Sequence, residues 1–358
     1  MSMTKLLFFI PSLVNSAGTE RISTSLANFL VKKGYHVDFV VHSLNTNSFF
    51  SIDSKVKILS LGLDGDINSH KFRAAWRLRK LIKANSYDVV LNVGVACSYV
   101  TLLAMPYLLG CKVISWEHFS IKGLNLKRRI KHYFAASLVD KTIVLTYADS
   151  SAYPAILKNK VEVIPNFTSI NEYGQSATLS NKVVLACGRL EESVKQFDLL
   201  IDSWKIVNAT CPDWTLRIIG GGDAKKLYDK IRFLGLSKSI VLAGICDDMS
   251  KEYLGCSIVV VSSKYESFSL VIIESMSFGI PIVSFDCPLG PHEILTGCEG
   301  AKLVDNGNVN ALAGALIEVI SDEKLRLQMG KAALIRYKEK YSQNQIIDGW
   351  LNLLDMLN

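Results

Sequence analysis

Short apolar runs alternate with amphipathic segments from the start of the chain. Residues 6–10 are continuously apolar and predict a buried strand, while residues 19–33 carry apolar side chains at helical spacing. Gly34 ends this predicted helix, and residues 37–41 form the next strand. Further strands are predicted at residues 56–61, 88–93, 111–116, 141–145 and 161–164. Because strands and helices alternate, we expect a parallel sheet that helices cover on both faces.

A second series of the same kind follows a polar stretch at residues 168–177, which has little apolar periodicity. This series begins with a predicted strand at residues 182–187 and a helix at residues 197–207. Its further strands are predicted at residues 215–219, 239–243, 257–262, 281–285 and 301–304. The pattern predicts an N-terminal domain at residues 1–167, a linker at 168–180, a second domain at 181–340 and a terminal helical segment at 341–358.

The predicted topology also indicates where ligands bind. In open parallel sheets, ligands bind outside the carboxyl ends of the strands, so two facing sheets would form a cleft that holds the chemistry. No apolar run approaches the roughly 18 to 20 residues of a membrane-spanning helix. The apolar run at residues 6–10 ends at Pro11 and lacks a small-residue cleavage site, so we interpret it as a strand and not as a signal peptide.

Composition narrows the class of protein. A chain of 358 residues, of which 49% are hydrophobic and 20% charged, can bury sizeable cores. This excludes a disordered chain, a collagen and a small disulfide scaffold. The eight cysteines show neither C-x-x-C spacing nor a nearby pair of histidines. We therefore predict reduced, buried thiols and a cytoplasmic protein.

The net charge of +7 is divided unevenly along the chain. Residues 1–175 hold 21 Lys and Arg against 11 Asp and Glu, a net charge of +10, which leaves −3 for residues 176–358. Two segments of the basic half, residues 71–83 and 127–134, mix cations with aromatic residues. They are either helices that contact an anionic membrane surface or solvated faces of ordinary helices. No pattern of a nucleic-acid-binding module accompanies them, so we expect no nucleic-acid partner.

One segment joins two carboxylates to the start of a helix. A hydrophobic strand ends near Ser262, Glu266 lies in the following loop, and Glu274 lies in the second turn of a helix that begins near Ser269. Backbone amides at the start of such a helix, at Ser269 and Leu270, bind anions, and the carboxylates can accept hydrogen bonds from sugar hydroxyls. The alternative is that both glutamates are ordinary surface charges, but apolar neighbours on both sides of Glu274 disfavour its exposure.

These residues resemble the signature of retaining glycosyltransferases with the GT-B fold. That family has two glutamates separated by seven residues, as at Glu266 and Glu274, followed by a small-Met-small-x-Gly-x-Pro segment, as at residues 275–282. The resemblance continues along the chain: residues 18–21 resemble the Gly-rich first loop, 116–118 the central histidine segment, 164–166 the hinge and 188–195 the phosphate clamp. It implies an α/β protein with two Rossmann-like domains facing across a cleft, an N-terminal one that binds the acceptor and a second one that binds the nucleotide sugar. It also implies that the C-terminal helix at residues 341–358 crosses back to the N-terminal domain.

The resemblance also implies a role for each site residue. Glu274 would bind the ribose of the donor nucleotide, and Glu266 would bind hydroxyls of the transferred sugar. The remaining implied site residues are Arg189 and Lys195 on the diphosphate, His118 on the donor sugar, and Gly18, Ser269 and Leu270 around the nucleotide. Two fixed cations and helix amides stabilise the charge that develops on a leaving diphosphate, so no metal ion is expected.

Some positions depart from the family or carry other motifs. Ala17 and Ser267 stand where the family usually has glycine. Residues 64–66 have the D-x-D spacing of a metal site but are interpreted as a turn. Residues 220–222 lack the third glycine of a dinucleotide-binding loop, and we interpret them as a tight turn.

The resemblance finally implies a substrate class. Residues 286–294 resemble the Pro-Gly-Pro loop of bacterial enzymes that extend lipid-linked surface polysaccharides. The implied activity is a retaining hexosyltransferase that moves a hexose or N-acetylhexosamine from a UDP-sugar to a lipid-linked oligosaccharide, in O-antigen or capsule biosynthesis. It would act as a peripheral protein on the inner face of the cell membrane. The alternative is a catalytically inactive nucleotide-sugar-binding partner in a polysaccharide assembly complex.

Overall fold

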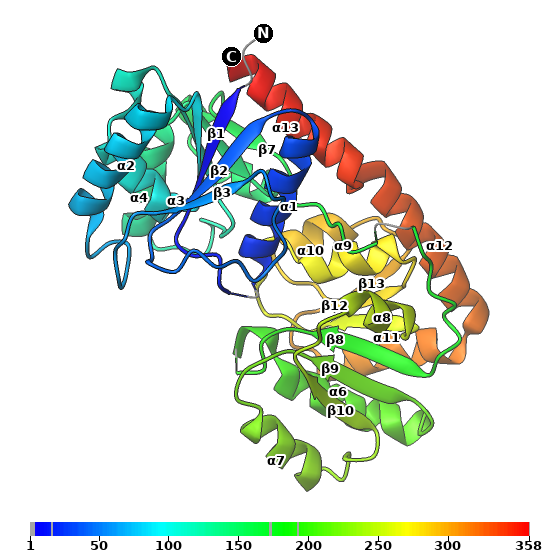
Figure 1. The fold of residues 1–358 in the computed structure, drawn as a ribbon. Coiled ribbons are helices and arrows are strands. Elements are labelled where there is room, and N and C mark those ends of the chain that lie inside the picture. The colour runs from blue at the N-terminus through cyan, green and yellow to red at the C-terminus, as the bar shows by residue number, and fades with distance from the viewer. Residues whose placement is uncertain (1–3, 16, 172–173, 192, 358) are drawn as a thin grey trace. The chain divides into compact units, whose positions relative to one another are not determined.

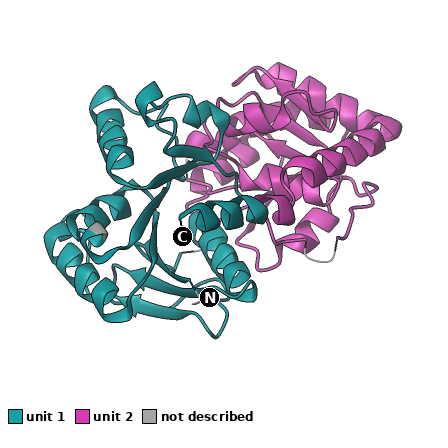
Figure 2. Ribbon diagram, turned by 90° about the horizontal axis from the view of Figure 1, so that it is seen from above, with its two compact units in different colours: residues 1–166, 347–358 teal, residues 167–346 magenta. Residues whose placement is uncertain are grey.

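A computed structural model describes residues 4–15, 17–171, 174–191 and 193–357. The chain divides into two compact units, which are shown together in Figure 1 and coloured separately in Figure 2. Unit 1 comprises residues 1–166 and 347–358, and unit 2 comprises residues 167–346. Residues 172 and 173 of the predicted linker lie outside the described residues.

Unit 1 is built on a seven-stranded parallel sheet with the strand order β3-β2-β1-β4-β5-β6-β7. Its strands are β1 (Lys5–Ile10), β2 (His36–Val41), β3 (Lys57–Ser60), β4 (Val89–Val93), β5 (Lys112–Trp116), β6 (Lys141–Val144) and β7 (Val161–Val163). The strand order reverses at β1 and β4, so the loops that follow these strands diverge at the carboxyl edge of the sheet.

Helices cover both faces of this sheet. They are α1 (Gly18–Lys32), α2 (Lys71–Asn85), α3 (Val95–Leu103), α4 (Leu126–Leu138), α5 (Tyr147–Ser150) and the greater part of α13 (Gln343–Leu357), with short 3-10 turns η1 (Pro106–Leu109) and η2 (Ala155–Leu157). Leu7 and Phe9 of β1 pack in one core cluster with side chains of α2 and α3. The ring of Trp116 contacts that of Trp350 on α13 at a centroid distance of 4.9 Å. The apolar run of β1 is buried throughout, because it is covered from both sides.

Unit 2 is built on a six-stranded parallel sheet with the order β10-β9-β8-β11-β12-β13. Its strands are β8 (Val183–Cys187), β9 (Thr215–Ile219), β10 (Ile240–Gly244), β11 (Ile258–Val261), β12 (Ile282–Phe285) and β13 (Ala301–Val304). Here the order reverses at β8 and β11, so the loops after these two strands are neighbours at the carboxyl edge.

The helices of unit 2 pack against its sheet and contribute to its hydrophobic core. They are α6 (Phe197–Thr210), α7 (Lys225–Phe233), α8 (Met249–Leu254), α9 (Leu270–Ser277), α10 (Gly290–Leu295), α11 (Val309–Ser321), α12 (Glu323–Lys340) and the start of α13, preceded by the 3-10 turn η3 (Ser193–Lys195). One core cluster of unit 2 joins α6 and α11 to β8, with Trp204 fully buried. The predicted helix at residues 197–207 is therefore confirmed and extends to Thr210.

The structure confirms the predicted strands and their parallel arrangement in both units. Six of the eight cysteines are buried, as predicted, whereas Cys187 and Cys246 are partly exposed, and burial raises the pKa of Cys287 to about 12. None of the helices in the described ranges combines the length and the hydropathy that crossing a bilayer requires.

Candidate active site

Glu266 lies in the loop between β11 and α9, at the carboxyl edge of the second sheet. Its side chain is 15% exposed, and its Oε1 accepts hydrogen bonds from Lys195 Nζ at 2.6 Å and Ser263 Oγ at 2.9 Å. The backbone of Glu266 forms an isolated parallel bridge with Leu289, and Gly290 N–H donates to Glu266 O at 3.3 Å. A Cβ on Gly290 would lie 2.4 Å from the Phe268 Cα, so only glycine permits this contact. The loop before α10 thus fixes the loop that carries Glu266.

Lys195 comes from the neighbouring loop, which follows β8. Ser262 Oγ donates to Lys195 O at 2.7 Å, and Lys264 N–H donates to Val194 O at 2.8 Å, so the loops after β8 and β11 are tied together. A Cβ on Gly188 would lie 2.9 Å from the Lys195 side chain, so the lysine packs closely over this glycine. The resemblance assigned Lys195 to the diphosphate and Glu266 to the sugar, and the structure pairs the two side chains directly.

Arg189 lies on the same loop as Lys195 and is exposed. Directly beneath this loop, a Cβ on Gly220 would lie 1.8 Å from Gly188 O. Residues 220–222 lie in the loop that joins β9 to α7, and Gly220 packs against the loop that carries Arg189.

The N-terminus of α9 adjoins the Glu266 loop. Ser269 is the N-cap residue, yet its side chain makes no capping hydrogen bond, and its buried Oγ has no hydrogen-bond partner among the described residues. Its φ of 75° is left-handed, as is the φ of 48° at Gln196 and of 80° at Leu289. Strained non-glycine residues persist where surrounding structure enforces them, and they cluster at functional sites. With the amide of Leu270 at the first helical position, this helix end can bind an anion.

Glu274 lies in the second turn of α9 and is 2% exposed. The hydroxyl of Tyr253 donates to Glu274 Oε2 at 2.7 Å. Tyr253 on α8 is itself fully buried and stacks on Phe278 at a centroid distance of 5.4 Å. The alternative that Glu274 is an exposed surface charge is therefore wrong. The sequence analysis missed Tyr253, because nothing in its neighbourhood marks it as the partner of a residue on another helix.

His118 lies at the carboxyl edge of the first sheet, two residues after β5, and is 8% exposed. Its ring contacts that of Trp116 at 4.4 Å, and its Nε2 is buried without a hydrogen-bond partner in the described chain. Burial lowers the pKa of His118 to about 3, so the imidazole is neutral at physiological pH. A neutral ring can accept a hydrogen bond from a hydroxyl or donate one to it, but its remaining N–H is too weakly acidic to act as a general acid.

Gly18 is the first residue of α1, which follows β1 in the same sheet. The preceding Ala17 has an extended backbone with φ −92°, which any residue can adopt. The departure from a double glycine at Ala17 therefore imposes no backbone strain.

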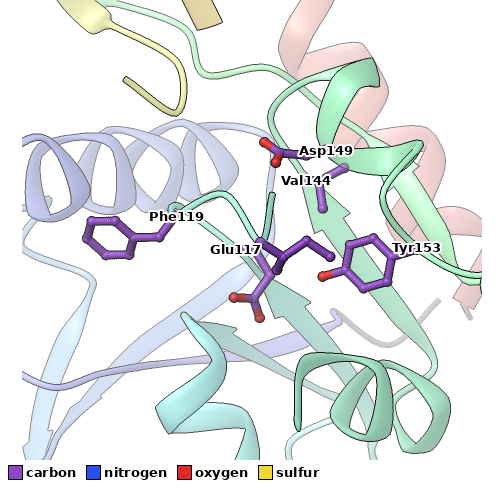
Figure 3. A pocket seen from close by; sticks show the side chains of 6 residues that line it. Glu117, Phe119, Val144, Asp149 and Tyr153 are labelled. Atoms are coloured by element: carbon purple, nitrogen blue, oxygen red, sulfur yellow. The ribbon is translucent and has the colours of Figure 1, made fainter. Parts of the chain in front are cut away.

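A small pocket in unit 1 holds carboxylates that the sequence analysis did not assign. Figure 3 shows this pocket, with the carboxylates of Glu117 and Asp149 pointing away from each other. It is lined by Glu117, Phe119, Ile121, Val144, Asp149 and Tyr153. Asp149 accepts a hydrogen bond from Thr146 Oγ1 at 2.9 Å and another from Ser120.

Glu117, which precedes His118, is buried between polar groups. It accepts hydrogen bonds from Ser115 Oγ at 2.5 Å and from the Val95 N–H at the start of α3. His132 Nδ1 lies 3.6 Å from Glu117 Oε2, beyond hydrogen-bonding distance. Burial raises the pKa of Glu117 to about 7, against the opposing effect of its two donors. Glu117 lies within residues 116–118, the segment that resembles the central histidine segment of the family, but only His118 was assigned a role there.

The D-x-D segment at residues 64–66 lies in a loop, as predicted. Asp66 accepts hydrogen bonds from the backbone and side-chain nitrogens of Asn68 at 2.7 and 2.8 Å. Across the described ranges, no three His, Cys, Asp or Glu side chains are grouped in a way that could hold a metal ion.

The structure thus brings some predicted site residues together and leaves others apart. Lys195 and Glu266 are in direct contact, and Ser269 and Leu270 follow Glu266 closely in sequence. Glu274 lies one turn further along α9, where Tyr253 donates a hydrogen bond to it. Gly18 and His118 belong to the carboxyl edge of the other sheet.

Comparisons with known proteins cover the whole chain. A sequence profile described as Glycosyl transferases group 1 matches residues 172–336, and one described as Glycosyltransferase Family 4 matches residues 16–172. An uncharacterized glycosyltransferase of Haemophilus influenzae is 32% identical over 98% of this chain and 100% of its own length. The amylovoran biosynthesis glycosyltransferase AmsD of Erwinia amylovora is 28% identical over 99% of this chain and 100% of its own. The solved structure of HepE from Anabaena in complex with UDP and glucose has a TM-score of 0.79 at 19% identity, covering 98% of this chain and 99% of HepE.

Proposed function

This chain belongs to the glycosyl transferases group 1 family and has the GT-B fold, and from that premise we propose its reaction. It transfers a hexose or an N-acetylhexosamine from a UDP-sugar to a lipid-linked oligosaccharide, with retention of the anomeric configuration. It acts in surface polysaccharide biosynthesis, on the cytoplasmic face of the cell membrane. The similarity to a biosynthetic enzyme of the polysaccharide amylovoran, and to a structure that contains UDP and glucose, supports this choice of pathway and donor.

The observation that carries the proposal is the contact between Lys195 and Glu266 beside the start of α9. A cation, a carboxylate and an unpartnered hydroxyl at Ser269 converge on one strand-to-helix loop. A diphosphate bound at the α9 amides would lie beside the ammonium group, and a sugar attached to it would lie beside the carboxylate. The ammonium group of Lys195 thus suits the charged diphosphate of a nucleotide sugar, and the carboxylate of Glu266 suits the hydroxyls of its sugar.

Each site residue then has one task. Glu274, fixed by Tyr253, accepts hydrogen bonds from the ribose, while Arg189, Lys195, Ser269 and Leu270 hold the diphosphate. Glu266 orients the hydroxyls of the transferred sugar, which His118 contacts as a neutral imidazole. Gly18 leaves room for the donor at the start of α1.

The chemical step breaks the bond between the anomeric carbon and the β-phosphate oxygen. The acceptor oxygen forms the new bond on the same face of the sugar, and its proton passes to the leaving diphosphate. Negative charge grows on that diphosphate as the bond breaks, so Arg189, Lys195 and the helix amides stabilise the transition state more than the ground state. These groups supply the positive charge that a metal ion would otherwise bring, and we propose that none is needed.

The test measures UDP release from UDP-sugars with and without a lipid-linked acceptor, in the presence of EDTA. Release that requires acceptor supports transfer, and a thermal shift by UDP without any release supports the inactive binding partner instead. Arg189→Ala should lower turnover roughly 100-fold with a smaller effect on UDP binding. Arg232→Ala, an exposed arginine on α7, serves as the matched control and should leave both unchanged.

A further inference from the structure

Helix α4 of unit 1 presents an apolar stripe to solvent. Its exposed apolar side chains are Leu126 at 69%, Ile130 at 54%, Phe134 at 59% and Leu138 at 53% exposure. They recur every four residues, so at about 100° per residue they fall within an arc of about 120° on the helix. Single exposed apolar residues are ordinary in proteins, but an aligned row along a whole helix marks an interaction surface.

The same helix is rich in exposed cations. Lys127, Arg128 and Lys131 are exposed, and no residue of α4 is acidic. At about 100° per residue, Lys127 lies within the arc of the apolar stripe and Lys131 lies at its border. Positive charge therefore accompanies the apolar stripe along the helix.

The remainder of α4 faces the protein. Ala135 and Ala136 are buried, and Arg129 is turned inward, where its Nε donates to Tyr133 Oη at 3.0 Å. Tyr133 Oη in turn donates to Ala152 O at 2.8 Å. These contacts hold α4 against the rest of unit 1 and fix the direction in which its apolar stripe faces. The stripe is therefore not the packing face of the helix.

We propose that the exposed face of α4 is a docking surface for an anionic lipid bilayer. Leucine, isoleucine and phenylalanine side chains enter the boundary between headgroups and acyl chains, while Lys127 and Lys131 contact anionic headgroups. A lysine inside the apolar arc and another at its border suit a bilayer, because their long side chains reach the headgroups while their carbon chains stay in the apolar layer. A protein partner for this face would need carboxylates interleaved with its apolar groups. An anionic bilayer offers charged headgroups above apolar acyl chains over its whole surface.

The role of this docking surface rests on the proposed function, in which the acceptor is a lipid-linked oligosaccharide. Helix α4 follows β5 and the loop of His118, so its first turn is eight residues beyond the histidine. Phe119 in that loop is 76% exposed. Docking of α4 would hold the carboxyl edge of the first sheet near the bilayer that carries the acceptor.

The test is co-sedimentation of the full chain with vesicles of phosphatidylcholine alone or with about one-third phosphatidylglycerol. Wild-type protein should bind the anionic vesicles and be released by salt. A cation near such a surface contributes about fivefold to partitioning, so Lys127→Gln with Lys131→Gln should lower it roughly 25-fold. Ile130→Ser with Phe134→Ser should also abolish most binding, even at low salt.

Matched controls lie on α12 of unit 2. Lys331→Gln with Ile335→Ser changes an exposed lysine and an isoleucine that is 56% exposed, and it should leave vesicle binding unchanged. All variants should keep the thermal shift caused by UDP, which checks that they are folded and that the donor site is intact.

Several results would overturn the proposal. They are absence of wild-type binding to anionic vesicles, equal binding to neutral vesicles, and equal loss in the α12 control. Concentration-dependent dimerisation, abolished by Ile130→Ser with Phe134→Ser while vesicle binding persists, would assign the stripe to a second copy of the chain. Intact vesicle binding without UDP binding or sugar transfer would refute the proposed function and leave the docking surface standing.

Discussion

Replacement of Glu117 by glutamine should change how the stability of this protein depends on pH. The carboxyl group of Glu117 is fully buried in unit 1, and burial raises its pKa from 4.5 to about 7. The nearby Asp149 raises this pKa further, while the Ser115 and Val95 donors oppose the shift. His132 lies 3.6 Å away, and burial lowers its pKa, so it brings little positive charge at neutral pH.

The magnitude follows from the difference between the two pKa values. Each pKa unit corresponds to about 1.4 kcal/mol, so a shift from 4.5 to about 7 amounts to about 3 kcal/mol. Between these two pH values the folded chain keeps a proton that the unfolded chain has lost. The free energy of unfolding therefore falls as pH rises from about 4.5, and the loss is complete above about pH 7. Glutamine stays neutral and keeps an acceptor oxygen for both donors.

The assay is urea unfolding of wild type and Glu117→Gln at several pH values between 5 and 8. Near pH 5 the two proteins should be almost equally stable, and by pH 8 the variant should be more stable by about 3 kcal/mol. Glu162→Gln, which removes a partly exposed partner of Lys141 in the same unit, should cost less than about 1 kcal/mol at every pH. A stability difference that stays constant or shrinks as pH rises would refute the burial argument.

Other consequences of the site geometry are equally open to measurement. Tyr253→Phe removes a donor 2.7 Å from the Glu274 carboxylate and should weaken UDP binding roughly tenfold by calorimetry, whereas Tyr228→Phe on the exposed face of α7 should not. Lys195→Met leaves Glu266 without its ammonium partner and should lower UDP-sugar turnover roughly 100-fold, more than it weakens UDP binding; equal effects on both would contradict a role in the transition state. Gly220→Ala places a Cβ 1.8 Å from Gly188 O and should destabilise unit 2 by more than about 2 kcal/mol in urea unfolding, whereas Gly314→Ala, with no atom within 4 Å inside α11, should stabilise it by about 0.5 to 1 kcal/mol.

The secondary structure could be predicted because each element leaves a local pattern. Apolar runs such as Leu6 to Ile10 become strands buried on both faces, and the helical spacing after Gly18 becomes α1. The location of Glu266 in a loop and Glu274 in the second turn of a helix followed from the same local reading, and the structure confirms both positions.

The partners of the site residues could not be predicted, because they come from distant parts of the chain. Lys195 and Glu266 are 71 residues apart and meet only because β8 and β11 are neighbours in the sheet. Tyr253 reaches Glu274 from another helix, and no periodicity marks that pairing.

The sequence by itself determined the two parallel sheets, their order of elements, the uneven charge and the residues that resemble the family signature. Tertiary structure alone decided which carboxylates are buried, which cation pairs with Glu266, and that the apolar row on α4 faces outward. The pattern of polar and apolar residues predicts which residues are suited to the interior, because this suitability depends on each residue's own side chain. Hydrogen-bond partners, pKa shifts and exposed stripes depend on which other elements pack around the residue, and that is fixed only when the sheet order brings distant loops together.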